Sequence, residues 1–326
     1  MGSSRFIKEI EGEEGKRFIT SIYYPVKETT CSPYLNLYEQ DMTEAITQFQ
    51  RIGLELDTLN QLNVSFQNNS PIQIRVKRSC VILSPGIGID RDMYTYLIEW
   101  FNKNGYIVIT IGHVFDTLFT IMLNQEFFLQ EESITNLDYS NFESLHHVVN
   151  RRKADILLVL KAIESWNDTD SDLKGLFDLN HIVGVGHSIG GAAMITLAQE
   201  SSSFKSVISL DGSLHLINSS QKLQAPLLQL RQQASSFEEM KHEWQMSIAQ
   251  AFANKQAELA RQNNVLAIKI KQADHLAFSD LPLLLRTNRE GVNIHQVIQE
   301  AILLFIEGKE SKSNRIAVID AEGFEL

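Results

Sequence analysis

Residues 181–193 of the chain read HIVGVGHSIGGAA, and this stretch carries the strongest local signal in the sequence. Its first half is apolar and contains β-branched residues, as in a short strand that is buried on both faces. Its second half fits the pattern G-x-S-x-G and continues into small residues that favour a helix. Ser188 therefore stands on a sharp turn between a strand and a helix. The stretch predicts a nucleophile elbow in an α/β fold.

The glycines around Ser188 have a physical reason. A serine on this turn takes a strained backbone conformation, which is tolerated only if its neighbours two positions away, Gly186 and Gly190, lack side chains. The hydroxyl then projects over the sheet, where the N-terminus of the following helix favours developing negative charge. The backbone N–H of Ile189 is the expected first donor of an oxyanion hole. A plain glycine-rich turn is the alternative interpretation.

Outward from the elbow, short apolar strands alternate with helices. The predicted strands lie at residues 18–24, 79–83, 106–111, 181–185, 206–210, 226–230 and 265–270. The predicted helices lie at residues 41–62, 93–102, 149–166, 190–199 and 294–306, with a helical excursion over 237–262. The strand at 18–24 has the alternation of a sheet edge. This order predicts a mainly parallel central sheet with helices on both faces.

A serine hydroxyl needs a base, and the base needs an acid that orients it. His275 stands five residues beyond Ile270, at the end of the last predicted strand, and is the expected base; a satisfied loop histidine is the alternative. Asp211 directly follows the strand at 206–210 and is the expected acid, with Glu238 as the fallback. Asp274 adjoins the histidine and is expected to set its loop.

The loop after the strand at 79–83 is the expected source of the second oxyanion donor. We expect the backbone N–H of Ile87 in that role, with Gly86 as the alternative and an ordinary turn as the bland interpretation. Gly86, His187 and His113 are the candidate substrate-binding residues. His113 and Asp116 offer too few ligands for a metal site. The sequence therefore predicts neither a metal nor a cofactor.

Charge and hydropathy exclude some classes of partner. The chain of 326 residues has 29 Lys+Arg against 40 Asp+Glu, and its formal net charge of −11 argues against unaided binding to nucleic acid or to anionic membranes. No apolar run reaches the ~20 residues of a membrane span, so stable membrane insertion is not expected. The N-terminus lacks the apolar core of a signal peptide, which leaves the cytoplasm or export after removal of a leader. Cys31 and Cys80 are expected to be ordinary thiols, with a single bridge as the alternative.

Several motifs together resemble the platelet-activating factor acetylhydrolase family of serine-dependent α/β-hydrolases. The blocks occur in family order between about residues 18 and 310, and they are IYYP at 22–25, the turn at 83–88, RxxD at 152–155, GHSIGGA at 186–192, SLDG at 209–212 and HxxFSD at 275–280. The resemblance implies a Ser-Asp-His triad, independence from metal ions, and hydrolysis of short or oxidised acyl chains at the second glycerol position of phospholipids. It also agrees with Asp211 as the acid. The chain departs from the family at Pro85, where the family often has histidine.

These observations predict one α/β-hydrolase domain over residues 1–326, with an N-terminal extension at about 1–77 and a helical insertion at about 236–262 before the last strand. The expected activity is hydrolysis of carboxylic esters, with phospholipids as the favoured substrates. A non-phospholipid carboxylesterase or dienelactone-type hydrolase is one alternative. A catalytically silent binding protein on the same scaffold is another, because fold does not fix function. The oligomeric state is left open.

Overall fold

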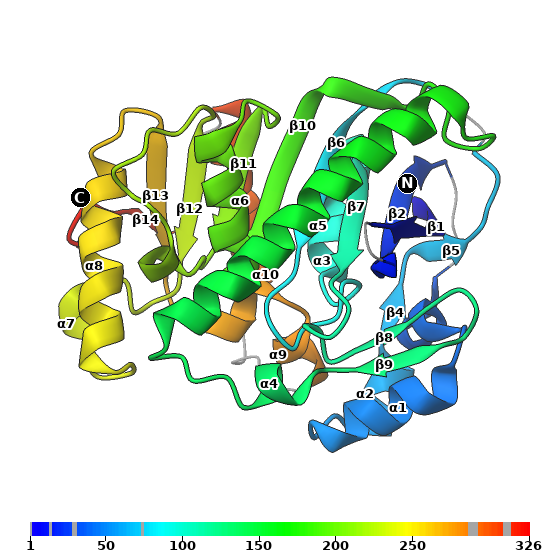
Figure 1. Cartoon of the computed structure of the whole chain (residues 1–326), viewed down its shortest axis with the longest axis horizontal. Helices are drawn as coiled ribbons and strands as arrows, with labels where there is room; N and C mark the ends of the chain where they lie inside the picture. The colour runs from blue at the N-terminus through cyan, green and yellow to red at the C-terminus, as the bar shows by residue number, and fades with distance from the viewer. Residues whose placement is uncertain (1, 13–14, 28–30, 73–74, 286–292, 309–313) are drawn as a thin grey trace. The chain divides into compact units, whose positions relative to one another are not determined.

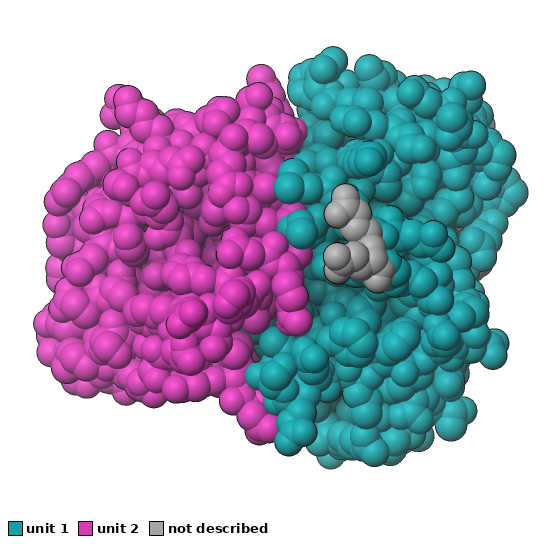
Figure 2. Space-filling model, viewed as in Figure 1, with its two compact units in different colours: residues 1–135, 154–182, 279–290 teal, residues 136–153, 183–278, 291–326 magenta. Residues whose placement is uncertain are grey.

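The computed structural model describes residues 2–12, 15–27, 31–72, 75–285, 293–308 and 314–326. The chain divides into two compact units, which Figure 2 shows in different colours. Unit 1 comprises residues 1–135, 154–182 and 279–290, and unit 2 comprises residues 136–153, 183–278 and 291–326. The helix α5 (Phe142–Thr169) starts in unit 2 and ends in unit 1. The strand β10 (Phe177–His187) starts in unit 1 and ends in unit 2.

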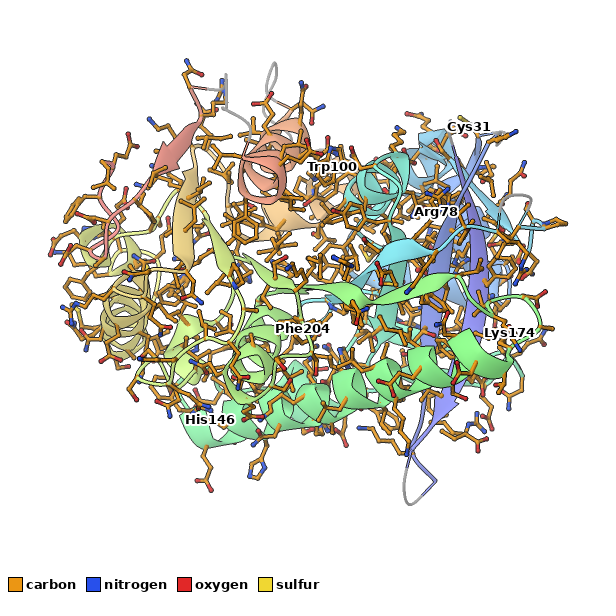
Figure 3. The ribbon with its side chains drawn as sticks, turned by 90° about the horizontal axis from the view of Figure 1, so that it is seen from above. Cys31, Arg78, Trp100, His146, Lys174 and Phe204 are labelled. Atoms are coloured by element: carbon orange, nitrogen blue, oxygen red, sulfur yellow. The ribbon has the colours of Figure 1, made fainter. Side chains whose placement is uncertain are left out.

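The strands of unit 1 form a mixed arrangement around one parallel pair. Strand β6 runs parallel to β7, β7 is antiparallel to β2, β2 is antiparallel to β1, and β1 is parallel to β5. These strands are β1 (Gly2–Glu11), β2 (Arg17–Val26), β5 (Phe66–Asn68), β6 (Arg78–Ser84) and β7 (Ile107–Gly112). Helix α3 (Thr95–Lys103), which carries Trp100, covers one face, and the second half of α5 covers the other (Figures 1 and 3).

The other elements of unit 1 are short. Two antiparallel pairs, β3 with β4 and β8 with β9, lie outside the main sheet. The short elements are β3 (Ser32–Pro33), η2 (Tyr34–Tyr38), α1 (Met42–Arg51), α2 (Leu56–Gln61), β4 (Asn63–Val64), β8 (Phe119–Ile121), β9 (Phe127–Leu129), α4 (Glu132–Thr135) and α9 (Leu281–Leu284).

Unit 2 contains the parallel run β10, β11, β12 and β13, with a short antiparallel strand β14 beside β13. Helix α6 covers one face of these strands and α10 covers the other (Figures 1 and 3). The elements are α6 (Ile189–Glu200), β11 (Ser206–Leu210), η3 (Leu214–Leu216), β12 (Leu227–Arg231), α7 (Phe237–Met240), α8 (Met246–Ala260), β13 (Val265–Ile270), η4 (His275–Phe278), α10 (Ile294–Glu307) and β14 (Ile316–Val318).

Burial of the parallel strands explains why most of their residues are apolar. Every residue of β7 and β12 is buried, because helices cover both faces of the strands. The strands predicted at 206–210 and 265–270 have those bounds, and the others shift by a few residues at their ends. The predicted α/β class with a mainly parallel sheet is confirmed. The helical excursion is formed by two helices, α7 and α8, and it precedes β13, which β14 follows in the chain.

The single helix predicted at residues 41–62 is wrong. The structure has two helices there, α1 and α2, because Gly53 takes a left-handed φ of 86° that ends the first. Apolar residues recur at helical spacing through both helices, so the periodicity predicted one continuous helix. A glycine at the C-terminal side of a helix is a frequent stop signal that the periodicity outweighed.

The strand predicted at 18–24 is not at a sheet edge, because β2 lies between β7 and β1. Strand β1 was not predicted, since this strand opens with polar residues. Those residues are nevertheless buried with partners. Ser4 donates to the Ser70 carbonyl at 2.7 Å, and Arg5 forms an ion pair with Asp92 at 2.6 Å. Hydrogen bonds and ion pairs thus allow the polar side chains of β1 to be buried without the apolar alternation by which a strand is predicted from sequence.

Two further expectations concern the surface and the thiols. Among the described residues, no helix combines the length and the apolar character that crossing a membrane requires. Cys31 is exposed, as Figure 3 also shows, and Cys80 is buried; both are free thiols. Burial raises the pKa of Cys80 to about 12, so this residue is an inert packing thiol.

Candidate active site

The turn at Ser188 joins β10 to α6 in unit 2. Ser188 has a φ of 55° and a ψ of −122°, a conformation that is strained for a residue with a side chain. A Cβ atom at Gly186 would lie 2.3 Å from the carbonyl oxygen of Gly190, and one at Gly191 would lie 2.7 Å from the Cα of Gly212. Glycine is therefore required at position 186, as the sequence pattern predicts, and at position 191, one residue beyond the second glycine of the pattern.

His275 connects the serine to a carboxylate. Its Nε2 lies 3.0 Å from the Ser188 Oγ, and its Nδ1 lies 2.6 Å from the Asp211 Oδ2. A neutral imidazole that donates from Nδ1 to the carboxylate leaves Nε2 to accept the serine proton. The side chain of His275 is 38% exposed, whereas that of Asp211 is fully buried. The three residues expected from the sequence thus form one hydrogen-bonded chain within unit 2.

Asp211 follows β11 directly and adopts a positive φ of 45°. Burial acts to raise the pKa of this carboxyl, but the ion pair with Arg231 and the hydrogen bonds from His275 and the Gln232 N–H lower it to about 2. The carboxylate therefore stays ionised throughout the pH range in which a histidine serves as a base. A negative partner orients the imidazole and stabilises it when it is protonated.

The alternative acid lies elsewhere. The side chain of Glu238 is 62% exposed on α7 and forms an ion pair with Lys241, so it does not contact His275. Asp274 is exposed, and its carboxylate accepts from the Ala277 N–H at 2.9 Å. This bond sets the turn that carries His275, which is the role expected from the sequence.

His187 precedes the serine and has no exposed surface. Its Nε2 donates to the backbone carbonyl of His275 at 3.0 Å, and the two rings lie 4.9 Å apart. Burial, together with the positive charge of a protonated His275, lowers the pKa of His187 to about 3. His187 is thus neutral and holds the backbone of the base, and a side chain buried to this degree does not reach a substrate in this structure.

The expected oxyanion donors lie in different units. Ile189 is the first residue of α6 in unit 2. Ile87 lies in unit 1 between β6 and α3. The N–H groups of both neighbouring residues already have acceptors: the Gly86 N–H donates to the Tyr94 hydroxyl at 2.8 Å, and the Gly88 N–H donates to the Asp116 carbonyl at 3.0 Å. Within the described residues, no hydrogen bond is found for the Ile87 N–H. Its role as a donor stays a prediction.

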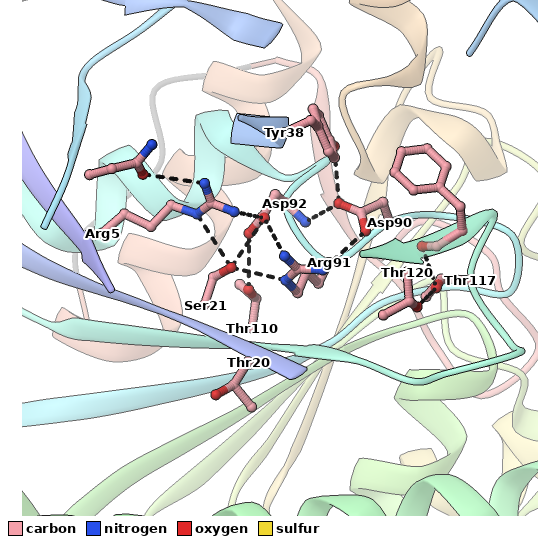
Figure 4. A network of polar contacts seen from close by, with 12 residues as sticks. Arg5, Thr20, Ser21, Tyr38, Asp90, Arg91, Asp92, Thr110, Thr117 and Thr120 are labelled. Atoms are coloured by element: carbon pink, nitrogen blue, oxygen red, sulfur yellow. Dashed lines mark hydrogen bonds and ion pairs between the residues drawn. The ribbon is translucent and has the colours of Figure 1, made fainter. Parts of the chain in front are cut away.

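The loop that follows Ile87 is fixed by a buried network of charges within unit 1 (Figure 4). Asp92 forms ion pairs with Arg5 at 2.6 Å and with Arg91 at 3.4 Å, and all three side chains are at most 3% exposed. Burial opposes the charge of Asp92, yet the two guanidinium groups hold the pKa of this carboxyl below its usual value. Asp90 accepts from the Tyr38 hydroxyl at 3.0 Å. This network of buried charges was not predicted from the sequence.

His113 has a structural environment in unit 1. The side chain is 1% exposed, its Nε2 lies 2.9 Å from the Ser84 hydroxyl, and its Nδ1 lies 2.7 Å from Asp155. Asp155 also forms an ion pair with Lys16. Fixed between two elements, His113 offers no exposed atom to a ligand in this structure. The described residues contain no group of three or more His, Cys, Asp or Glu side chains placed to hold a metal ion.

Arg231 is the residue of this site that the sequence analysis missed. It ends β12, it is fully buried, and its guanidinium pairs with the Asp211 Oδ1. The only available signal was its position, because a charged residue at the end of a buried strand needs a partner.

Three comparisons relate this chain to known proteins. The family described as platelet-activating factor acetylhydrolase, isoform II, matches residues 8–289. A platelet-activating factor acetylhydrolase of Cavia porcellus is 24% identical over 212 residues, which cover 58% of this chain and 49% of that protein. The chain therefore spans about half the length of this curated relative.

A solved structure of a ferulic acid esterase from Streptomyces cinnamoneus superimposes with a TM-score of 0.69 at 16% identity, covering 98% of this chain and 96% of that one. At this identity the likeness concerns the fold, and it confirms the predicted α/β-hydrolase fold. The family match extends over most of the sequence, and the family is one of carboxylic ester hydrolases with a serine triad. The chain belongs to the platelet-activating factor acetylhydrolase, isoform II, family.

Proposed function

We propose that this chain is a serine hydrolase that releases short or oxidised acyl chains from the second glycerol position of phospholipids. The observation that carries the proposal is the chain of hydrogen bonds from Ser188 through His275 to Asp211. Family membership supports ester hydrolysis, and the acetylhydrolase from Cavia porcellus supports a phospholipid substrate.

The proposed reaction has two halves. Ser188 attacks the ester carbonyl while Nε2 of His275 takes its proton, and the protonated imidazole then delivers that proton to the leaving alcohol. Water then attacks the acyl-serine while the same imidazole takes its proton, and the imidazolium returns that proton to the Ser188 Oγ as the carboxylic acid leaves. Asp211 holds the ring in the tautomer that both halves need. The N–H of Ile189 at the start of α6 supports the negative charge that forms on the carbonyl oxygen, with the Ile87 N–H as the second donor expected from the sequence.

A panel of substrates tests the lipid assignment. Phospholipids with acetyl, butyryl, hexanoyl and long unmodified chains at the second position are compared with simple acetate esters and a dienelactone. We expect kcat/KM to be highest for the short-chain phospholipids and to fall by at least about tenfold for the long chains. Rapid turnover of simple esters with none of the phospholipids would show a carboxylesterase of another substrate class.

Activity is expected to survive chelation. The proposed nucleophile is activated by a histidine and not by a bound ion, so prolonged treatment with EDTA should leave the rate of ester hydrolysis unchanged within about twofold. The check is the initial rate before and after treatment and dialysis. A loss that one particular metal restores would contradict the proposed mechanism.

A further inference from the structure

The buried guanidinium of Arg231 occupies an unusual place in this site. In the sequence, the end of the strand after Asp211 is where many hydrolases of this class place their acid, and the chain has Leu230 and Arg231 there. The structure has the carboxylate at the end of β11 and a cation at the end of β12. The neighbouring strand ends thus bring opposite charges together.

Asp211 divides its two oxygens between two functions. Oδ2 accepts from His275, whereas Oδ1 accepts from Arg231 and from the Gln232 N–H at 3.2 Å. The carboxylate is therefore held from behind, and its rotation would break the bonds at Oδ1. Asp211 and Arg231 have no exposed side-chain surface, so water does not screen their interaction.

Arg231 is itself fixed by its surroundings. The guanidinium carbon lies 4.0 Å from the centre of the Phe252 ring on α8. One nitrogen donates to the Ala234 carbonyl at 3.3 Å and contacts the sulfur of Met240 at 3.5 Å. Aromatic stacking and a backbone acceptor restrain the planar group, as they would not restrain a flexible ammonium.

We propose that Arg231 is a positioning residue of the triad: it fixes Asp211 toward His275, and its permanent charge opposes protonation of the imidazole. This inference deepens the proposed function and rests on it. Asp211 favours the imidazolium, because a negative neighbour stabilises a cation. The positive charge of Arg231 opposes part of that effect.

Other charged groups also lie near the site. Arg152 is fully buried, and its positive charge acts on His187. His187 faces His275 but is neutral, since its pKa is about 3, and Asp274 is exposed to solvent. Glu239 and Glu243 act on Arg231 from the α7 segment, and Glu239 is itself paired with Lys269 at 3.1 Å.

One more histidine, His215, interacts electrostatically with Arg231. Burial, with repulsion from His146 and Arg231, lowers the pKa of His215 to about 4. Its titration therefore lies below the range in which the acid limb of a histidine-dependent reaction is measured.

The test is the pH dependence of kcat/KM for a soluble acetate ester. In Arg231→Gln the acid limb should move upward by about one pH unit, which lowers kcat/KM about tenfold at a given pH on that limb. Arg231→Lys keeps the charge but loses the planar fork. The acid limb of the lysine variant should stay at the wild-type pH, while its plateau kcat should fall several-fold because Asp211 is held less firmly. Lys241→Gln removes a partly exposed positive charge at the end of α7 and is the matched control, with no shift expected.

The outcomes separate the proposal from a merely structural role. A folded Arg231→Gln variant with an unmoved acid limb, or a lysine variant that shifts as far as the glutamine variant, would overturn it. If Arg231→Gln does not fold, Arg231→Met removes the charge and keeps the contact with Phe252. If neither variant folds, Arg231→Lys decides. An acid limb that moves although the charge is retained would contradict the proposal. An acid limb that stays in place, together with a lower plateau kcat, would support it.

A second readout does not depend on turnover. The NMR signals of the His275 ring nitrogens report its protonation directly, and their titration should move upward in the neutral variants by the same amount as the acid limb. Failure of the wild-type protein to hydrolyse any ester would therefore contradict the proposed function alone. An unmoved NMR titration in a folded neutral variant would contradict the inference alone.

Discussion

Ser188→Ala should abolish both ester hydrolysis and covalent labelling by a fluorophosphonate, while the protein stays folded. Removal of a triad nucleophile costs about 10⁶-fold in kcat where it has been measured, because no other group forms the acyl intermediate. Alanine meets the same backbone strain at a φ of 55° as serine does, so we expect the free energy of unfolding to change by less than about 1 kcal/mol. Initial rates, gel-based labelling and thermal unfolding measure the three effects.

Ser213→Ala is the matched control for this experiment. The backbone N–H of Ser213 donates to the Ser188 carbonyl at 2.9 Å, and its side chain is not part of the hydrogen-bonded chain to Asp211. This variant should keep its activity and its labelling. Full labelling of Ser188→Ala would instead place the nucleophile at another residue.

Asp211→Asn should lose about 10⁴-fold in kcat at neutral pH, since an amide favours the wrong tautomer of the imidazole. Glu238→Gln should stay within about tenfold of the wild type, which corresponds to at most about 1.4 kcal/mol. The two residues differ in burial as well as in position, because Asp211 is fully buried and Glu238 lies at the surface. The reverse pattern of activities would refute the assignment of the acid.

The same substitution should also destabilise the protein. Asp211→Asn leaves the buried Arg231 without its counter-charge, and breaking a buried ion pair on one side costs about 3–5 kcal/mol. The double variant Asp211→Asn/Arg231→Gln removes both charges. It should regain part of the lost stability without regaining activity, which a comparison of melting temperatures and rates would reveal. Equal stability of the single and double variants would contradict this account.

The core of the site could be predicted from the sequence because each of its residues adjoins a feature with a strong local signal. Ser188 lies in a glycine pattern that follows an apolar strand, Asp211 directly follows such a strand, and His275 comes just after the last strand of the parallel run. Arg231 shows no such signal. Its meaning depends on the pairing of β11 with β12, which brings two strand ends together and which no local pattern records.

The same distinction holds for the fold. Strands covered on both faces appear as apolar runs, and these were predicted to within a few residues. Strand β1 was missed because long-range partners satisfy its polar residues: Arg5 meets Asp92, which lies 87 positions later in the chain. Periodicity detects burial by apolar groups, and it does not detect burial that charge pairs make possible.

The contact between Gly191 and Gly212 bears on how this protein would be engineered. The backbones of the elbow and of the turn after Asp211 touch with no side chain between them, so the smallest added group would press the two segments apart. A library of variants aimed at new acyl or alcohol groups should therefore leave Gly191 and Gly212 unchanged and vary other positions. The turns that carry the nucleophile and its acid thus form one tightly packed arrangement, and new substrate specificity is better sought in the segments around it.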